Sequence, residues 1–109
     1  MEIKKGDIVI IKSPLNPKGT ELKKTRPVIV VSPKEMTKFA KRVIVVPLAS
    51  NTKKIYPFET LIRSTAKNSK ACCDQIQTIS TERIIEKYGS ISYLEIKNLD
   101  IALGEILQI

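Results

Sequence analysis

The sequence Arg26-Pro27-Val28-Ile29-Val30-Val31-Ser32-Pro33 decides the fold of this chain. Four consecutive β-branched apolar residues lie between two prolines, and such an unbroken run is typical of a strand that is buried on both faces. A second run, residues 42–48, repeats the pattern as Arg-Val-Ile-Val-Val-Pro-Leu. Its proline cannot donate a ladder hydrogen bond, so we expect it at the end of the strand or at an edge of the sheet. The two runs predict two strands, of which the first is buried on both faces.

Further strand patterns lie before and after these two runs in the sequence. Residues 7–12 follow Gly6 and predict a first strand, which leads into a loop containing Pro and Gly. Residues 56–63 predict a fourth strand and residues 71–79 a fifth. Residues 34–40 form a short link that is compatible with a helix, and residues 80–90 fit either a short helix closed by Gly89 or an edge strand. Strands therefore dominate the first three quarters of the chain.

The period of the apolar pattern changes near the C-terminus. Apolar residues recur there at helical spacing, at Ile96, Leu99, Leu103, Ile106 and Leu107. Ser92-Tyr-Leu-Glu95 has the form of a capping box, in which each of the two polar side chains binds the backbone of the other residue and starts a helix. The pattern therefore predicts an α+β fold, an antiparallel sheet or small barrel with a terminal helix packed against it.

Length and composition limit the classes of function. A chain of 109 residues with 42% hydrophobic residues predicts one domain spanning residues 1–109. The apolar runs are far shorter than the roughly 18 residues of a membrane span, and the N-terminus lacks an apolar signal core, so we expect a cytoplasmic protein without membrane contact. The chain has no histidine, and its two cysteines, Cys72 and Cys73, are adjacent. We therefore expect neither a metal site nor another cofactor, and any catalysis must use Arg, Lys, Asp, Glu, Ser, Thr, Tyr or Cys side chains.

The distribution of charge indicates a polyanionic partner. The chain carries 19 basic and 11 acidic residues, a formal net charge of +8. Residues 1–54 contain 13 of the basic and 4 of the acidic residues, whereas residues 55–109 contain 6 and 7. One half thus carries the whole positive excess, which favours nucleic-acid binding, with a lysine-rich surface that only confers solubility as the alternative.

Several segments together resemble the MazF/PemK/Kid toxins. They occur in the order and spacing of that family and span nearly the whole chain: Gly6-Asp-Ile-Val, Pro17-Lys-Gly-Thr-Glu21, Arg26-Pro-Val-Ile-Val-Val-Ser-Pro33, Val45-Val-Pro47, Tyr56-Pro-Phe-Glu59 and Asp74-Gln-Ile-Gln-Thr-Ile79. The most specific are the Arg-Pro strand and the Asp-Gln-x-x-Thr-Ile segment.

The resemblance implies a fold and an activity. The fold is a small SH3-like antiparallel β-barrel with a C-terminal helix, assembled as a homodimer whose interface groove binds single-stranded RNA. The activity is sequence-selective, metal-independent cleavage of mRNA that leaves a 2′,3′-cyclic phosphate and a 5′-hydroxyl. This chemistry suits a chain without histidine, because the RNA supplies its own 2′-hydroxyl nucleophile and the protein needs only a base, an acid and a cation for the phosphorane.

The resemblance also assigns candidate catalytic residues. Arg26 matches the catalytic arginine of the family, and a guanidinium can pair two phosphate oxygens in fixed geometry. Glu21, next to Thr20 where some members carry histidine, is a candidate general base, with a solvated loop glutamate as the alternative. Asp74 matches an acid or base of the Kid-like branch, or it binds backbone amides at a strand end. Gln75 is suited to contact a base edge or a phosphate, or is structural.

This sequence departs from the family pattern at several positions. The Thr or Ser that usually follows the Val-Pro-x unit is Ala49, which has no hydroxyl to donate, and Ser50 is the candidate substitute. Cys72 replaces an arginine of the Kid-like branch, and Gln77 stands where several members have arginine and remains a candidate RNA contact. We expect one of the two cysteines in the core and the other facing the groove or solvent, since successive strand residues face opposite sides.

Lysines and aromatic residues near the predicted groove have less specific assignments. We interpret Lys18, Lys23, Lys24, Lys53 and Lys54, together with Thr20, as an RNA-binding rim that follows the phosphates, with ordinary solvated surface as the alternative. Tyr56 and Phe58 can stack on bases, but core or dimer contacts are the preferred interpretation.

Two other functions and one partner complete the hypotheses. A gyrase-poisoning toxin of the CcdB type is disfavoured, because that branch resembles a chain ending Trp-Gly-Ile, whereas this chain has no Trp and ends Leu-Gln-Ile109. A catalytically silent nucleic-acid-binding SH3-like module remains an alternative because of Ala49. The family and the charge imply an acidic antitoxin of the MazE/PemI type, whose disordered segment would compete with RNA for the basic groove.

Overall fold

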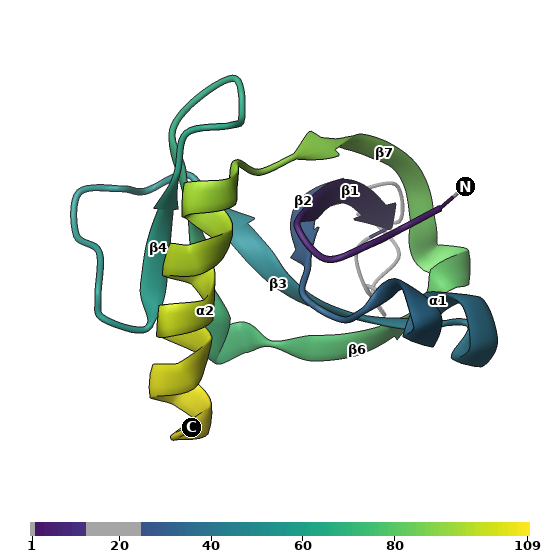
Figure 1. The fold of residues 1–109 in the computed structure, drawn as a ribbon. Helices are drawn as coiled ribbons and strands as arrows, with labels where there is room; N and C mark the ends of the chain where they lie inside the picture. Colours follow the sequence, from purple (N-terminus) through teal and green to yellow (C-terminus); the bar gives the residue numbers. More distant parts are fainter. Residues whose placement is uncertain (1, 13–24) are drawn as a thin grey trace, which may run out of the picture.

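The computed structural model describes residues 2–12 and 25–109, and its elements are drawn in Figure 1. In chain order they are β1 (Asp7–Lys12), β2 (Thr25–Val30), α1 (Lys34–Ala40), β3 (Arg42–Ala49), β4 (Glu59–Ile62), β5 (Ser69–Cys72), the 3-10 turn η1 (Cys73–Gln75), β6 (Gln77–Ser80), the 3-10 turn η2 (Thr81–Arg83), β7 (Ile84–Ser90) and α2 (Tyr93–Leu107). The predicted antiparallel α+β fold with a C-terminal helix is confirmed.

The strands form one curved antiparallel sheet in which β3 is the central strand. The order of the strands is β4-β5-β3-β2-β1-β7, and β6 pairs with the first half of β3. Figure 1 shows β1 and β2 enclosed by β3, β6 and β7, with α2 beside β4. Among the described strands the hydrogen-bonded path ends at β4 and β7, so the sheet curls around a core without closing completely into the expected barrel.

The proline of β3 occupies a gap in the ladder. Pro47 lies within a central strand and pairs with Val28 of β2 on one side, so the expectation of a strand end or sheet edge is wrong. On the other side of β3, β6 pairs up to Val45 and β5 begins to pair at Leu48. Because Pro47 falls between these two partners, a residue without an N–H is tolerated there.

The apolar run that decides the fold is buried on both faces. Val28 and Val30 lie in one core cluster, with Val9, Val43 and Val45. Ile29 points the other way into a second cluster, which joins the sheet to Leu99 and Ala102 of α2. All three residues of β2 in these clusters are at most 1% exposed, which explains why the sequence shows no polar alternation there.

The Gly6-Asp7 motif fixes the start of the chain to β7. Gly6 has a φ of 94°, and a Cβ built on it would lie 2.9 Å from the Ile96 side chain, so glycine is required by both conformation and space. The fully buried Asp7 carboxylate accepts hydrogen bonds from the Lys4 backbone N–H (2.9 Å) and the Ser90 hydroxyl (3.3 Å), and pairs with Lys87 Nζ at 3.3 Å. The motif therefore has a structural explanation.

Several predicted boundaries shift in the structure. Only residues 59–62 of the predicted strand 56–63 pair as β4, and the predicted strand 71–79 is split into β5 and β6 by η1. Residues 34–40 are helical. Residues 80–90 contain η2 and then β7, which pairs with β1 at the end of the sheet, so the edge-strand alternative is correct for most of that segment. Over residues 2–12 and 25–109, neither α-helix has the length and apolar character needed to cross a lipid bilayer.

The capping box of α2 is present and also ties the helix to β4. The Ser92 hydroxyl accepts from the Glu95 backbone N–H (3.1 Å), and Glu95 Oε1 accepts from the Ser92 N–H (2.9 Å). The same carboxylate accepts from the Arg63 backbone N–H at 2.6 Å and from the Ser64 hydroxyl. Burial raises the pKa of Glu95, but hydrogen bonds from Ser64, Arg63 and Ser92 outweigh burial, and the pKa lies below the ordinary value of 4.5.

Replacing Glu95 with glutamine is expected to lower the free energy of unfolding by about 1–2 kcal/mol at pH 7, because a charged acceptor of several bonds is lost. The folded-state pKa is lowered, so the contribution of the wild-type carboxylate is complete above pH 4.5 and is lost as the pH falls through the lower folded-state pKa. Urea unfolding at several pH values should show the two proteins converging in stability below pH 4.5. A stability difference that is constant down to strong acid would contradict this role.

Candidate functional site

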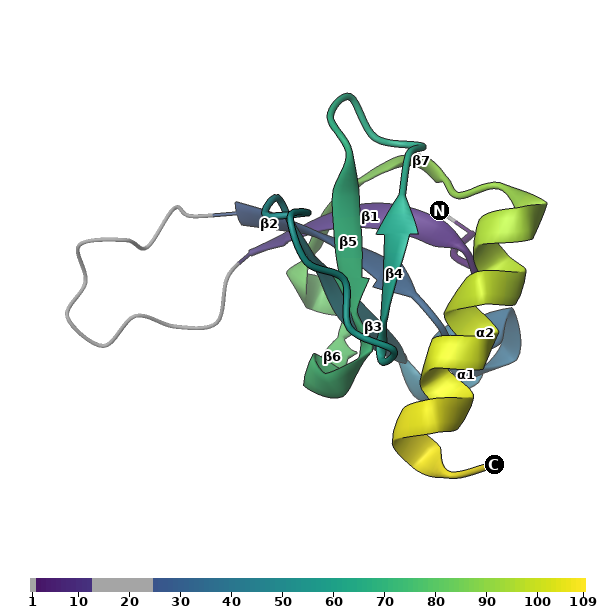
Figure 2. The same cartoon turned by 90° about the vertical axis from the view of Figure 1, so that its left-hand side faces the viewer.

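Arg26 lies where the beginning of β2 meets the end of β3. It is exposed and pairs with Ile11 of β1 on one side. On the other side the ladder brings Val28 opposite Pro47, so the chain segment with Arg26 runs alongside the one that ends at Ala49. Ala49 in turn pairs with Lys70 of β5. Figure 2 shows β4 and β5 next to each other, with β3 and β2 following in the sheet.

A sheltered ion pair lies next to this strand end. Lys70 Nζ is 3.0 Å from Glu59 Oε1, and the two side chains are only 13% and 8% exposed. Glu59 also accepts from the Tyr56 backbone N–H at 3.0 Å. Burial raises the pKa of Glu59, but the Tyr56 N–H and the Lys70 ammonium outweigh burial, so the pKa is lowered and the group is a carboxylate. The sequence predicted neither residue as part of a site.

The pKa of the Cys72 thiol depends on four charged side chains. Its thiol is buried, and burial raises its pKa, as do the negative charges of Glu59 and Asp74. The positive charges of Lys70 and Arg26 act in the opposite direction on the same thiol. Four charged side chains thus act on the Cys72 thiol, and we call these four together with Cys72 the strand-end cluster: Arg26, Glu59, Lys70, Cys72 and Asp74.

Both cysteines are buried, contrary to the expectation that one faces the groove or solvent. Cys72 is the last residue of β5 and Cys73 begins η1, so the alternation of a regular strand stops between them and both side chains enter the interior. Burial raises the pKa of Cys73 to about 12, with Cys72, Asp74 and Glu59 adding to the effect. Neither thiol is a reactive nucleophile at neutral pH.

The predicted polar residues that follow Cys73 are on the surface. Asp74 and Gln75 are exposed in η1, which packs against α2 and β3, and Gln77 is exposed at the start of β6 opposite Val45. Asp74 is one of the charges that act on the Cys72 thiol, as Arg26 and Lys70 are, whereas Gln77 lies farther along β3, at its pairing with β6.

The predicted residues after β3 lie in the exposed connection to β4. Ser50 is exposed directly after Ala49, and Lys53 and Lys54 are exposed beyond it. The Lys54 carbonyl accepts a hydrogen bond from Lys70 Nζ at 3.1 Å, and the Lys54 ammonium is 5.0 Å from the centre of the Tyr56 ring. Tyr56 stacks on Phe58 with ring centres 5.4 Å apart, so the two aromatic side chains contact each other.

Five further predicted residues fall in residues 13–24, outside the described part of the chain. They are the candidate base Glu21 and the candidate RNA contacts Lys18, Thr20, Lys23 and Lys24.

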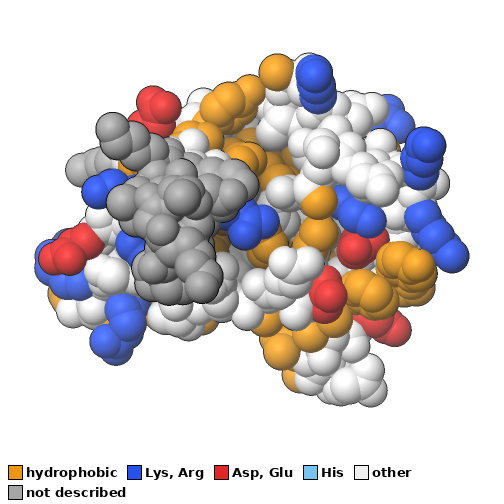
Figure 3. All heavy atoms as spheres, turned by 180° about the vertical axis from the view of Figure 1, so that it is seen from behind, with side chains coloured by type: hydrophobic (Ala, Val, Ile, Leu, Met, Phe, Trp, Pro, Cys, Tyr) orange, Lys and Arg blue, Asp and Glu red, His pale blue; other side chains and the backbone are white. Residues whose placement is uncertain are grey.

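Figure 3 shows one face of the molecule, on which basic, acidic and apolar side chains are interspersed rather than separated into fields of one sign.

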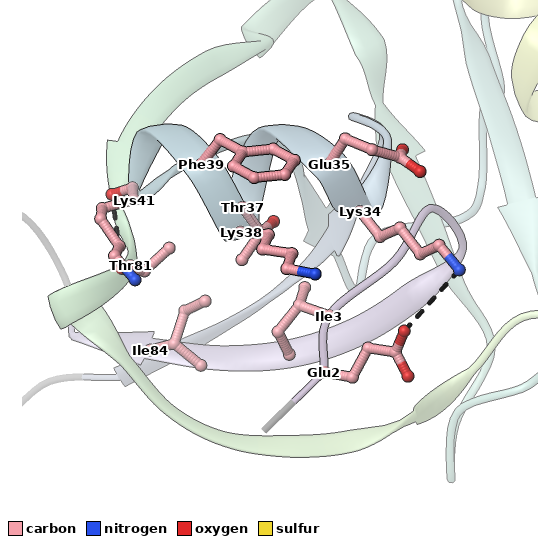
Figure 4. Close-up of a pocket in the computed structure, with 10 residues that line it drawn as sticks. All are labelled: Glu2, Ile3, Lys34, Glu35, Thr37, Lys38, Phe39, Lys41, Thr81 and Ile84. Atoms are coloured by element: carbon pink, nitrogen blue, oxygen red, sulfur yellow. Dashed lines mark hydrogen bonds and ion pairs between the residues drawn. The ribbon is translucent and has the colours of Figure 1, made fainter.

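A separate pocket lies between α1, the N-terminal segment and η2. Its volume is about 810 Å³, and Lys34, Lys38 and Lys41 contribute to its wall together with the exposed ring of Phe39 (Figure 4). None of the residues predicted to bind or cleave RNA lines it.

Among the described residues, no group of three His, Cys, Asp or Glu side chains is placed to hold a metal ion. In the part of the chain that the structure describes, the candidate site is therefore the strand-end cluster, which combines two cations with two carboxylates.

The fold is a curved antiparallel sheet with a C-terminal helix, and comparisons with known proteins show to which class of small domain it belongs. The structure superposes on an endoribonuclease in complex with its cognate antitoxin from a mycobacterial species, with a TM-score of 0.81 and 15% identity over 97% of this chain and 95% of that one. It also superposes on MazF from Deinococcus radiodurans, with a TM-score of 0.79 and 22% identity over 100% and 99% of the two chains.

Sequence comparison gives the family. Residues 4–107 match the model of the PemK-like, MazF-like toxins of type II toxin-antitoxin systems. The chain is 37% identical over 95 residues to endoribonuclease MazF9 of Mycobacterium tuberculosis, covering 79% of this chain and 80% of the relative. The protein belongs to the PemK/MazF toxin family.

Proposed function

We propose that this protein is the toxin of a type II toxin-antitoxin system, a single domain over residues 1–109 that cleaves single-stranded RNA at selected sequences without a metal. The observation that carries the proposal is the exposed Arg26 at the start of β2, which lies alongside the end of β3 where Ala49 pairs with Lys70, in a chain of this family. The name of the 37% identical relative, an endoribonuclease, supports the same activity. We place this activity in the cytoplasm, where mRNA is the available substrate.

The reaction is an internal transesterification. The 2′-hydroxyl oxygen forms a bond to phosphorus, the bond from phosphorus to the 5′-oxygen breaks, and the products are a 2′,3′-cyclic phosphate and a 5′-hydroxyl. One base takes the proton of the 2′-hydroxyl and one acid gives a proton to the departing 5′-oxygen. The Arg26 guanidinium pairs two phosphate oxygens as negative charge builds on them. Asp74 is the exposed carboxylate available for one of the proton transfers, and Glu21 remains the candidate for the other.

Two structural neighbours and the positive net charge of the chain support the proposal that an acidic protein inhibits it. The relatives include an endoribonuclease solved with its cognate antitoxin and a MazE-MazF complex from Deinococcus radiodurans. We propose that an acidic antitoxin segment competes with RNA for the basic surface, and that two copies of this chain form the RNA-binding groove. Competition between two anions for the same cations weakens as salt rises.

The experiment that tests the activity is incubation of the purified protein with a long single-stranded RNA in the presence of EDTA, with the new ends mapped by primer extension. Cleavage at one recurrent short sequence supports the proposal, and cyclic-phosphate ends support the chemistry. RNA that is bound but stays intact favours the second candidate, a silent RNA-binding module. That candidate rests on Ala49, whose methyl group stands where the family pattern has a hydroxyl.

A further inference from the structure

The register of the sheet places a cation beside the residue that departs from the family pattern. Ala49 and Lys70 are direct partners in the antiparallel ladder between β3 and β5. Paired residues project their side chains to the same face of a sheet, with Cβ atoms about 4.5–5.5 Å apart. Lys70 therefore rises from the sheet next to the position at which a Thr or Ser hydroxyl would stand.

The contacts of Lys70 fix its ammonium in one place. Glu59 Oε1 lies 3.0 Å and the Lys54 carbonyl 3.1 Å from Nζ, and the centre of the Tyr56 ring lies 6.0 Å away. An ammonium has three N–H donors, so these two acceptors leave a third donor for an incoming oxygen. The side chain is 13% exposed, so little water competes for this third donor, although the Glu59 carboxylate offsets part of the positive charge.

The register of the sheet also relates Lys70 to Arg26. Val28 pairs with Pro47, so Arg26 lies alongside Ala49 on one side of β3, and Lys70 pairs with Ala49 on the other side. Lys53 and Lys54 lie in the exposed connection beyond β3. A phosphate bound over Ala49 thus has a cation on each side, and Glu59 keeps Lys70 in position. Glu59 itself is engaged by the Tyr56 N–H and by Lys70.

We propose that Lys70 donates the second hydrogen bond to the scissile phosphate and so takes over the task that the missing hydroxyl at Ala49 would have. This inference rests on the proposed ribonuclease function. It names Lys70 as a catalytic residue and Glu59 as the residue that positions it.

The first test measures RNA cleavage by the wild type, Lys70→Met and Lys38→Met, where Lys38 is an exposed lysine of α1 outside the cluster. We expect Lys70→Met to lower kcat by roughly 10- to 100-fold, and Lys38→Met to match the wild type. Because Lys70→Met leaves the Glu59 carboxylate unpaired, the double variant Glu59→Gln with Lys70→Met separates loss of the cation from loss of folding. Wild-type kcat in a folded Lys70→Met protein would overturn the assignment.

The second test asks whether a hydroxyl can replace the cation. Adding Ala49→Thr to Lys70→Met should recover cleavage by roughly tenfold, whereas Ala49→Thr alone should change little, since coupled residues give non-additive effects. Equal effects of Ala49→Thr in both backgrounds would show that the two positions do not share a task.

Binding provides a readout that does not depend on activity. An RNA with 2′-deoxy nucleotides cannot form the cyclic phosphate, and its affinity can be followed by fluorescence anisotropy against salt. Loss of one phosphate contact should reduce the slope of log affinity against log salt by about 0.7 for Lys70→Met. A wild-type protein that binds this RNA but cleaves no ordinary RNA overturns both proposals, whereas cleavage and a salt slope that are unchanged in Lys70→Met overturn only the role of Lys70.

Discussion

Replacing Arg26 with alanine is expected to lower kcat/KM for RNA cleavage by about 10²- to 10³-fold, the usual loss when one donor to a developing oxyanion is removed. Arg26 is exposed at the start of β2, alongside the end of β3, so its removal leaves Lys70, the partner of Ala49 on β5, as the remaining cation of the cluster. Initial rates on a short fluorescent RNA that contains the mapped cleavage sequence give this number directly.

Two variants make the Arg26 result specific. Arg42→Ala removes an exposed arginine at the opposite end of β3, opposite Ser80, and should cleave like the wild type. Arg26→Lys keeps the charge but loses the planar pair of donors, so we expect an intermediate rate. If Arg26→Ala and Arg42→Ala lose activity equally, the positive charge matters only for general attraction of RNA, and Arg26 is not a catalytic residue.

Replacing Leu99 with alanine is expected to lower the free energy of unfolding by about 3–5 kcal/mol. Leu99 is 0% exposed and joins α2 to Ile8, Ile29 and Val46 of the sheet. Truncation removes buried apolar surface and leaves a cavity. The loss is large, because the whole free energy of unfolding of a native protein is only about 5–15 kcal/mol. Urea unfolding followed by circular dichroism measures the loss.

Leu94→Ala is the matched control on the same helix. Its side chain is 65% exposed, so its truncation should change stability by no more than about 0.5 kcal/mol. An equally large loss in both variants would mean that the outer face of α2 is covered in solution, which the proposed homodimer would explain. A small loss in Leu99→Ala would contradict the packing of α2 on the sheet.

Local patterns predicted the parts of the fold that depend on local forces. The run at residues 28–31 and the box from Ser92 to Glu95 correspond to a buried strand and a capped helix, because burial on both faces and capping each leave a direct mark on sequence. The division of residues 71–79 was not predicted, because η1 forms where the chain turns from one partner position on β3 to another.

The candidate site was predicted only in part, for a similar reason. Arg26 and Asp74 were proposed from short motifs, and in the structure both charges act on the Cys72 thiol. Lys70 was missed because its proximity to Ala49 depends on the register between β3 and β5, which no local pattern encodes. Glu59 stands in a quoted motif, but its ion pair spans two strands. The assignments of Glu21 and of the lysines near it remain predictions.

The pairing of β3 determines when the parts of the sheet can come together during synthesis. β3 pairs with β2, which precedes it in the chain. Its other partners, β5 and β6, and the helix α2 that packs on the sheet all follow it. A ribosome therefore releases Arg26 long before Lys70, Asp74 and the final helix, and domains generally fold as units once their segments are available. The residues that we propose to act on the phosphate therefore come together only after the later strands and the helix have been synthesised.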